Sequence, residues 1–304
     1  MSNLVTDVKN LELETLKNLK SSKALNTLRA YKADYKDFAG FCIKHSFKSM
    51  PTDPKILSLY LTHLSKICKF STLKRRLASI SVIHRLSGHY IDTKHPMITE
   101  NLMGIKRVKG SYQKAKKPIL INDLKLIVNV IDKDKNEKNR FKNRALILLG
   151  FAGGFRRSEL VAILHEDVDF VPEGVKIFVK RSKTDQSGEG MTKGIPYFSN
   201  PDYCPVISLK NWIEKSEIKS GKIFDISDKS VALTIKKYTA IAGLDSNKYS
   251  GHSLRSGFAT STAELGAEER SIMAMTGHKT TQMVRRYIHE ANLFKNNALN
   301  KIKI

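Results

Sequence analysis

Apolar residues recur at spacings of three and four through the N-terminal third of the chain, a pattern that predicts amphipathic helices. Asp53 and Pro54 have the types preferred at the N-cap and at the first helical position, and Ser71 has the type preferred at a cap. The expected helices cover residues 28–42, 54–68, 71–88 and 98–108. The pattern therefore predicts an all-helical N-terminal domain.

A basic segment without apolar periodicity follows these helices. It runs from Lys106 to Lys117 and ends at Pro118. Such a segment has no apolar face to pack, so it is typical of a connection between domains. The sequence predicts an N-terminal domain at 1–110, a linker at 111–118 and a C-terminal domain at 119–304.

The C-terminal part combines two periodicities. Residues 175–180 alternate between apolar and other side chains, which predicts a half-buried strand with Ile195 and Tyr197 in its hairpin partner. Other segments have helical spacing, and residues 132–142 are expected to form a charged loop. The expected helices cover 119–131, 145–152, 206–219, 229–242, a segment with His252 and Arg255, and 293–303, with a turn at 276–278. The expected fold is mainly α, with a mixed α+β C-terminal domain that contains a small antiparallel sheet.

Positive charge dominates the composition. Lys and Arg total 53 against 29 Asp and Glu, a formal net charge of +24 over 304 residues. This excess favours a polyanionic partner, either nucleic acid or an anionic membrane surface. No apolar run approaches the roughly 18 residues of a membrane span, and the N-terminus has no apolar signal region. Nucleic acid is therefore the better interpretation, and a merely soluble basic protein is the alternative.

The sequence gives no support to a metal or nucleotide cofactor. Cys42, Cys68 and Cys204 are scattered in apolar contexts without metal-ligand spacing, which predicts buried free thiols in a reducing cytosol. P-loop, dinucleotide-binding and H-E-x-x-H motifs are absent from the sequence. We therefore expect neither a metal site nor a bound cofactor.

Candidate chemistry gathers near the C-terminus. The motif G-H-S-L-R-S-G places His252 and Arg255 one helical turn apart, T-G-H-K adds His278, and R-R-Y-I-H adds Tyr287 nine residues later. Arg presents a planar fork of donors that matches two phosphate oxygens. His can move a proton near neutral pH, and a Tyr hydroxyl can act as a nucleophile among cations. This combination predicts phosphate chemistry without a metal.

The same motifs resemble those of the tyrosine recombinase (phage integrase) family. That family has H-x-x-R, then G-H, then a Tyr nine residues on, preceded by an Arg in G-[LF]-R-x-x-E-L and by a Lys in a β-hairpin. Here G-F-R-R-S-E-L supplies Arg156 and Glu159, and R-S-K-T-D supplies Lys183. The specific motifs lie between Gly154 and Tyr287, in the order of the family.

The resemblance implies a site-specific recombinase that cleaves and rejoins DNA without a metal or ATP. The implied catalytic set is Arg156, Lys183, His252, Arg255, His278 and Tyr287, with Glu159 in support. Arg156 and Arg255 would clamp the phosphate, and Tyr287 would form a 3′-phosphotyrosyl bond. Lys183 would protonate the leaving 5′ oxygen, and the two histidines would bond the phosphate or manage the Tyr proton.

Several positions have competitors in the sequence. They are Arg157 for the first clamp, Arg181 and Lys193 for the acid, and Tyr238 and Tyr249 for the nucleophile. Only Arg156 lies one helical turn before Glu159, and neither competing Tyr follows the G-H motif at the family distance.

Double-stranded DNA is the expected partner. The resemblance implies a helical core-binding (SAM-like) N-terminal domain, a C-shaped clamp around the duplex, a tetrameric synaptic complex and accessory DNA-bending proteins. The expected location is the cytoplasm, at the nucleoid. The expected DNA contacts are Thr72, Lys74, Arg75, Arg76, Lys114, Lys116 and Lys117. A type IB topoisomerase and a non-catalytic DNA-binding protein of the same fold are the alternatives.

Overall fold

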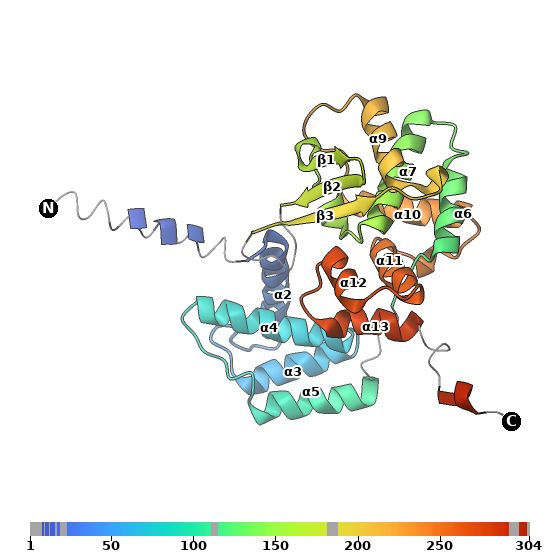
Figure 1. The fold of residues 1–304 in the computed structure, drawn as a ribbon. Coiled ribbons are helices and arrows are strands. Elements are labelled where there is room, and N and C mark those ends of the chain that lie inside the picture. Colours follow the sequence, from blue (N-terminus) through green and yellow to red (C-terminus); the bar gives the residue numbers. More distant parts are fainter. Residues whose placement is uncertain are drawn as a thin grey trace. The chain divides into compact units, whose positions relative to one another are not determined.

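The computed structural model contains two compact units, the N-terminal unit Met1–Lys114 and the C-terminal unit Ala115–Ile304 (Figure 1). It describes residues 8, 10–11, 13–15, 17–18, 23–110, 115–180, 188–291 and 298–302. The boundary between the units falls inside the segment expected to be a linker. Each unit has its own hydrophobic core.

Helices form the described part of the N-terminal unit. They are α2 (Leu25–Lys44), α3 (Pro54–Ser65), α4 (Phe70–Leu86) and α5 (Pro96–Lys109). Their apolar faces meet in a core that includes Phe38, Leu57 and Tyr60, as the helical spacing predicts. The predicted start of α3 is confirmed, because the Asp53 side chain accepts a hydrogen bond from the Ile56 amide at 2.8 Å.

The predicted cap of α4 at Ser71 is wrong. The carbonyl of Lys69 already accepts hydrogen bonds from the amides of Thr72 (2.9 Å) and Leu73 (3.3 Å), so the helix begins at Phe70. The extended backbone that an N-cap requires is at Lys69 (φ −71°, ψ 152°). Ser71 consequently lies within the first turn and is exposed.

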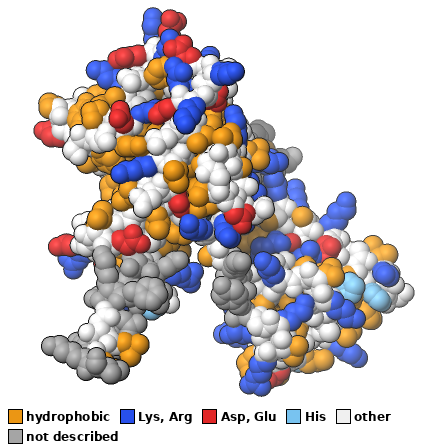
Figure 2. Space-filling view, turned by 90° about the vertical axis from the view of Figure 1, so that its right-hand side faces the viewer, with side chains coloured by type: hydrophobic (Ala, Val, Ile, Leu, Met, Phe, Trp, Pro, Cys, Tyr) orange, Lys and Arg blue, Asp and Glu red, His pale blue; other side chains and the backbone are white. Residues whose placement is uncertain are grey.

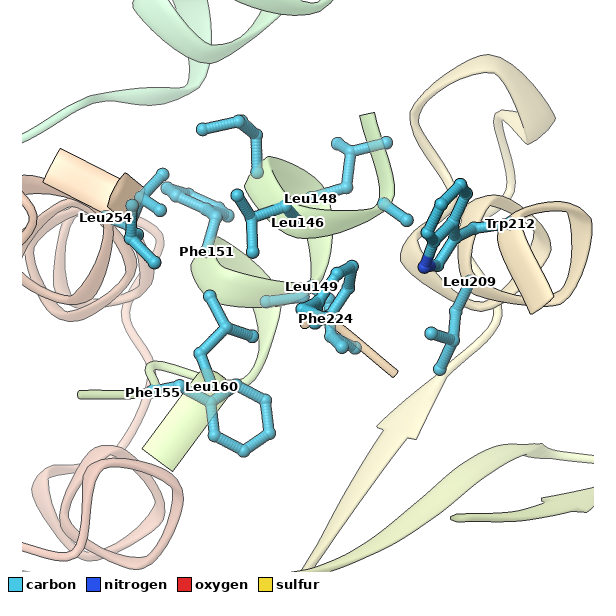
Figure 3. Packing of buried hydrophobic residues seen from close by; sticks show 14 of the residues in the cluster. Leu146, Leu148, Leu149, Phe151, Phe155, Leu160, Leu209, Trp212, Phe224 and Leu254 are labelled. Carbon is cyan, nitrogen blue, oxygen red and sulfur yellow. The ribbon is translucent and has the colours of Figure 1, made fainter. Parts of the chain in front are cut away.

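The C-terminal unit is organised around α7. Its helices are α6 (Ile121–Ile131), α7 (Glu137–Ala152), α8 (Arg157–Leu160), α9 (Pro205–Ser216), α10 (Asp228–Ile241), α11 (Ser253–Glu264), α12 (Glu269–Thr276) and α13 (Thr281–Ala291). Every residue of α7 from Ala145 to Ala152 is buried, which identifies a helix enclosed on all sides. In Figure 3, Phe151 extends toward Leu254 of α11, whereas Trp212 of α9 lies on the opposite side of α7.

The charged loop predicted at 132–142 is wrong in its second half. The side chain of Asn136 accepts a hydrogen bond from the Asn139 amide at 2.9 Å, and α7 begins at Glu137. Glu137 and Lys138 are exposed, so the first turn of this helix carries charge instead of an apolar face. Apolar periodicity therefore could not reveal where the helix begins.

The small sheet is antiparallel, in the order β1-β2-β3. The strands are β1 (Val168–Val171), β2 (Gly174–Val179) and β3 (Met191–Pro196). The predicted hairpin of β2 and β3 is confirmed, with Ile177 paired to Lys193 and Val175 paired to Ile195. Tyr197, which was also expected in the partner strand, follows the end of β3 at Pro196. The sequence did not predict β1, whose residues are only half-buried or exposed and give no alternating signal.

The C-terminal end differs from expectation where it is described. A helix was expected at 293–303, but residues 292–297 and 303–304 lie outside the described part of the chain. The remainder, Ala298–Lys301, forms a 3-10 turn in which the Ile302 amide bonds the Leu299 carbonyl at 3.0 Å. Among the described residues, no helix has the length and apolar character of a membrane span.

Candidate active site

A tight turn after α7 starts the site. Gly153 caps the helix, and Gly154 adopts φ +53°, in the left-handed region that favours glycine. A Cβ on Gly154 would lie 3.0 Å from the Phe258 ring and 3.3 Å from the Thr276 side chain, so a larger residue would also crowd the neighbouring helices. The turn places Arg156 at the N-cap position, directly before α8.

Glu159 holds Arg156 at two points. This carboxylate is 3% exposed and accepts a hydrogen bond from Arg156 Nη1 at 2.5 Å and from the Arg156 backbone amide at 2.9 Å. Arg156 Nη2 also donates to the carbonyl of Gly277 at 3.4 Å. The neighbouring Arg157 is 41% exposed in its side chain and lies 3.9 Å from Asp228. Arg156 is therefore the oriented guanidinium of this pair.

The second guanidinium, Arg255, projects from α11 into the interior. It is 1% exposed. Its Nη1 donates to the carbonyl of Gly154 at 2.8 Å, and its Nη2 donates to His278 Nε2 at 3.0 Å. Burial and, second to it, the charge of Arg156 together lower the pKa of Arg255 to about 10, so the group remains cationic at neutral pH. Arg255 Nε is buried and has no hydrogen-bond partner among the described residues.

His278 is held as a neutral imidazole in one tautomer. An arginine can only donate, so Nε2 of His278 must accept the bond from Arg255 and the proton must be on Nδ1. Nδ1 then donates to Thr276 Oγ1 at 2.8 Å, and that hydroxyl donates to the Ile272 carbonyl at 2.6 Å. Burial, followed by the charges of the arginines, lowers the pKa of His278 to about 4. Thr276 is a supporting residue that the sequence pattern did not identify.

Tyr287 lies beside this imidazole on α13. The two ring centroids are 6.2 Å apart, and the ring planes are inclined by 36°. The tyrosine is half-buried against a small apolar cluster that includes Ala259, Ile272 and Val284. Packing thus places the Tyr287 ring near a guanidinium and an imidazole, which is the environment that a tyrosine nucleophile needs.

The competing tyrosines are structural. Tyr238 is 1% exposed and donates its hydroxyl to Asp134 at 2.7 Å, and Tyr249 is 2% exposed and donates to Asp123 at 2.9 Å. Burial raises the pKa of both hydroxyls, and the carboxylates raise it further. Neither residue therefore has the character of an activated nucleophile.

The remaining predicted residues are His252 and Lys183. His252 precedes α11 directly and is exposed, and its charge contributes to the lowered pKa of His278. Lys183 and its competitor Arg181 lie outside the described residues. The other competitor, Lys193, is 1% exposed and donates to the Gly153 carbonyl at 2.7 Å.

Positive charge exceeds negative charge in this site. The side chains of Arg156, Arg255 and Lys193 influence one another electrostatically, and Glu159 is the carboxylate among them. Cations gathered in a desolvated place favour an anion, and two guanidinium forks match the oxygens of a phosphate. The arrangement can therefore bind a phosphodiester and stabilise the additional charge of its transition state.

Comparison with known proteins agrees with this chemistry. The sequence model of the phage integrase family matches residues 119–293. The chain belongs to this family. The recombinase is 42% identical over 307 residues to an integrase/recombinase XerD homologue from Selenomonas ruminantium, over 96% of this chain and 89% of the relative. It is 25% identical to a tyrosine recombinase from Agathobacter rectalis, over 87% and 86% of the two chains.

Solved structures share the fold of the recombinase. The XerH site-specific recombinase, in a post-cleavage complex with its difH substrate, matches with a TM-score of 0.65 at 18% identity, over 83% of this chain and 72% of XerH. A lambda integrase dimer bound to a core site matches with a TM-score of 0.60 at 17% identity, over 96% and 98%. The two-domain fold, mainly α with a small antiparallel sheet, is therefore that of tyrosine recombinases.

The residues expected at DNA in the N-terminal unit differ in how far their side chains are exposed and in whether they are ion-paired. Arg76 is ion-paired to Asp37 and donates to the Tyr60 hydroxyl at 2.6 Å. Arg75 is ion-paired to Asp34 but has a side chain that is 47% exposed. Lys74 is exposed and Thr72 is half-buried. Arg76 thus contributes to the packing of the unit, and contact of these four residues with DNA stays a prediction.

The linker lysines also have partners within the C-terminal unit. Lys116 Nζ donates to the Asn247 carbonyl at 2.5 Å, and Lys117 Nζ lies 3.2 Å from Asp123. Lys114 lies outside the described residues. Figure 2 shows Lys and Arg side chains spread over its visible face, where they do not form a single patch. A role of these three lysines at DNA stays a prediction.

Proposed function

We propose that the recombinase cuts and rejoins duplex DNA at specific sites through a covalent bond between Tyr287 and a 3′ phosphate, without a metal or ATP. The observation that carries this proposal is the convergence of Arg156, Arg255 and neutral His278 beside the Tyr287 ring. Guanidinium groups can supply the positive charge that a divalent cation supplies elsewhere. The positions of the family motifs support the same assignment.

The proposed step exchanges one phosphoester bond for another. The Tyr287 hydroxyl oxygen bonds to phosphorus as the bond from phosphorus to the 5′ oxygen breaks. The tyrosine proton passes to His252, because both ring nitrogens of His278 are already hydrogen-bonded. Lys183 donates a proton to the departing 5′ oxygen, which leaves as a hydroxyl. Attack by a 5′ hydroxyl reverses these events and restores the phosphodiester. Because the covalent bond conserves its energy, rejoining needs no nucleotide.

The first test is the formation of a covalent complex in EDTA. The substrate is a site enriched by binding from a random duplex library, nicked 3′ of the cleavage position so that the released fragment diffuses away. We expect a denaturant-resistant adduct between protein and DNA without added Mg²⁺ or ATP. An adduct that forms only with Mg²⁺ would sink the arginine-clamp mechanism. If no adduct forms under any condition, the alternative of a non-catalytic DNA-binding protein with this fold would be favoured.

A sulfur substitution tests Lys183 as the general acid. A thiolate is a better leaving group than an alkoxide, so a nicked duplex with sulfur at the bridging 5′ position does not need the proton. Lys183→Ala should cleave normal DNA about 10²-fold more slowly than wild type and the sulfur-bridged duplex almost equally fast. The measurement is single-turnover cleavage of both duplexes.

Arg181→Ala and Lys193→Ala are the matched variants for this test. Neither should show a defect that sulfur corrects. If one of them is rescued and Lys183→Ala is not, the acid belongs to that residue. If no variant is rescued, the proton comes from a histidine or from water.

We also propose that protomers assemble into a tetramer through their C-terminal tails. Leu299 and Ile302 are apolar residues that are 67% and 57% exposed in the single chain. An apolar tail that enters the next protomer gives a head-to-tail contact, and such contacts close into a ring when the rotation permits. Deletion of residues 294–304 should leave binding to a single site intact and abolish tetramers, as measured by light scattering on DNA. Tetramers of the shortened protein would refute this role of the tail.

A further inference from the structure

Lys193 is a buried lysine in the middle of β3. It is 1% exposed, and the alternation of the strand directs it to the same face as buried Ile195. It pairs in register with Ile177 of β2, which is also buried. An ammonium group is costly to remove from water unless charges or dipoles compensate. An apolar side chain of similar length would fill the position at a smaller desolvation cost, so the presence of the amino group requires an explanation.

Within the described part of the chain, the hydrogen bond and the ring contact of this ammonium group are both with the turn before Arg156. Lys193 Nζ donates to the Gly153 carbonyl at 2.7 Å. It also lies over the face of the Phe155 ring, 4.4 Å from the ring centroid, in a cation–π contact. The charged groups around it are the Glu159 carboxylate, which attracts it, and the Arg156 and Arg255 guanidiniums, which repel it. The lysine therefore joins strand β3 to the turn that delivers Arg156.

Two successive carbonyls of that turn accept bonds from cations on different elements. Gly153 accepts from Lys193 on β3, and Gly154 accepts from Arg255 on α11. With Gly154 at φ +53°, the backbone depends on its neighbours to select one conformation of the turn. Loss of either bond would allow Arg156 to shift relative to Arg255.

We propose that Lys193 is a positioning residue, which fixes the Gly153–Arg156 turn and thereby sets the spacing of Arg156 and Arg255 for the scissile phosphate. This inference rests on the proposed function of the two arginines. The side chain donates inward to a carbonyl of its own unit, so it acts on the phosphate through Arg156 and not by contact. A misplacement of about 1 Å can reduce a rate by about 10².

The charge on Lys193 makes this role sensitive to pH. The pKa of Lys193 is lowered to about 7, mainly by burial; the Glu159 carboxylate opposes this shift, and the Arg255 and Arg156 guanidiniums add to it. Below this pH the lysine is an ammonium that binds the Gly153 carbonyl strongly, and above it the neutral amine is a weaker donor. The advantage that Lys193 gives to cleavage should therefore be largest below neutral pH and decline as the pH rises through about 7.

The test compares Lys193→Met with Lys176→Met, which replaces an exposed lysine on the adjacent strand. We expect Lys193→Met to cleave the nicked duplex about 10–100-fold more slowly at pH 6, with an affinity for DNA within about twofold of wild type. Amide hydrogen exchange in the segment 153–156 should accelerate in Lys193→Met alone. The ratio of wild-type to variant rates should shrink between pH 6 and pH 8.5. Lys176→Met should match wild type throughout.

The outcomes separate this inference from the proposed function. Hydrogen exchange reports on the turn even if wild type forms no adduct, an outcome that would reject the function. Unchanged exchange and unchanged cleavage in Lys193→Met would overturn the positioning role. If cleavage, DNA affinity and unfolding temperature all fall together, Lys193 is only a structural residue. Lys193→Arg, which retains a charged donor, should recover part of the cleavage rate, and a rate equal to that of Lys193→Met would count against positioning.

Discussion

Replacement of Tyr287 by Phe is expected to abolish the covalent adduct and leave DNA affinity within about twofold of wild type. The substitution removes the attacking oxygen and keeps the ring that packs on Ala259, Ile272 and Val284. The ring also keeps its place beside His278, with the centroids 6.2 Å apart in the wild-type chain. We expect affinity to depend on many phosphate contacts, given the net charge of +24, so a single hydroxyl should contribute little to it. Gel analysis under denaturing conditions measures the adduct, and a filter-binding titration at fixed salt measures the affinity.

Tyr249→Phe and Tyr238→Phe are the matched controls for this prediction. Their hydroxyls bond Asp123 and Asp134, so both variants should lose stability but retain the adduct. Each removes one hydrogen bond to a carboxylate, which costs about 1–3 kcal/mol. Asp123 and Asp134 keep the Lys117 and Lys237 ammonium groups as partners. An adduct with Tyr287→Phe would show that another residue is the nucleophile. If one of the control variants loses the adduct at a temperature where it is folded, the tyrosine replaced in that variant is the nucleophile.

The sequence could predict features that depend on neighbouring residues. The cap at Asp53, the apolar helix ending at Ala152 and the alternation of β2 are local patterns, and the structure contains all of them. The candidate site residues could also be proposed from the sequence, because their motifs have fixed spacings within single helices or single turns. His278 follows the left-handed residue Gly277 (φ 62°) at the end of α12, a position that glycine signals in a sequence.

The sequence could not predict features that depend on distant partners. Lys193 appeared as one of several hairpin lysines, although its place two residues before Ile195 put it on the buried face of the strand. The bond to Gly153 joins residues 40 positions apart, and no local spacing reports it. Arg76 read as part of a basic surface, but Asp37 and Tyr60 from two other helices hold it. Burial of charge is decided by such partners and not by the sequence nearby.

Replacement of Arg255 by Lys is expected to reduce the cleavage rate about 10²–10³-fold, although the positive charge is kept. Arg255 is 1% exposed and divides its two amino groups between the Gly154 carbonyl and His278 Nε2. A lysine has a single ammonium and cannot reach both acceptors in a planar fork while it also presents a donor to the phosphate. Single-turnover cleavage of the nicked duplex measures the loss. Arg140→Lys, on the partly exposed first turn of α7, is the matched control and should cleave at the wild-type rate.

The sulfur-bridged duplex distinguishes a clamp from an acid at Arg255. A better leaving group removes the need for a proton but leaves the charge on the non-bridging oxygens to be stabilised. The defect of Arg255→Lys should therefore persist on the sulfur duplex, whereas that of Lys183→Ala should largely disappear. Recovery of Arg255→Lys on sulfur would move the proton transfer to the Arg255–His278 pair. In that case the hydrogen bond between Arg255 Nη2 and His278 Nε2, at 3.0 Å, would be a proton path, and the assignment of His278 as a neutral imidazole in one fixed tautomer would be wrong.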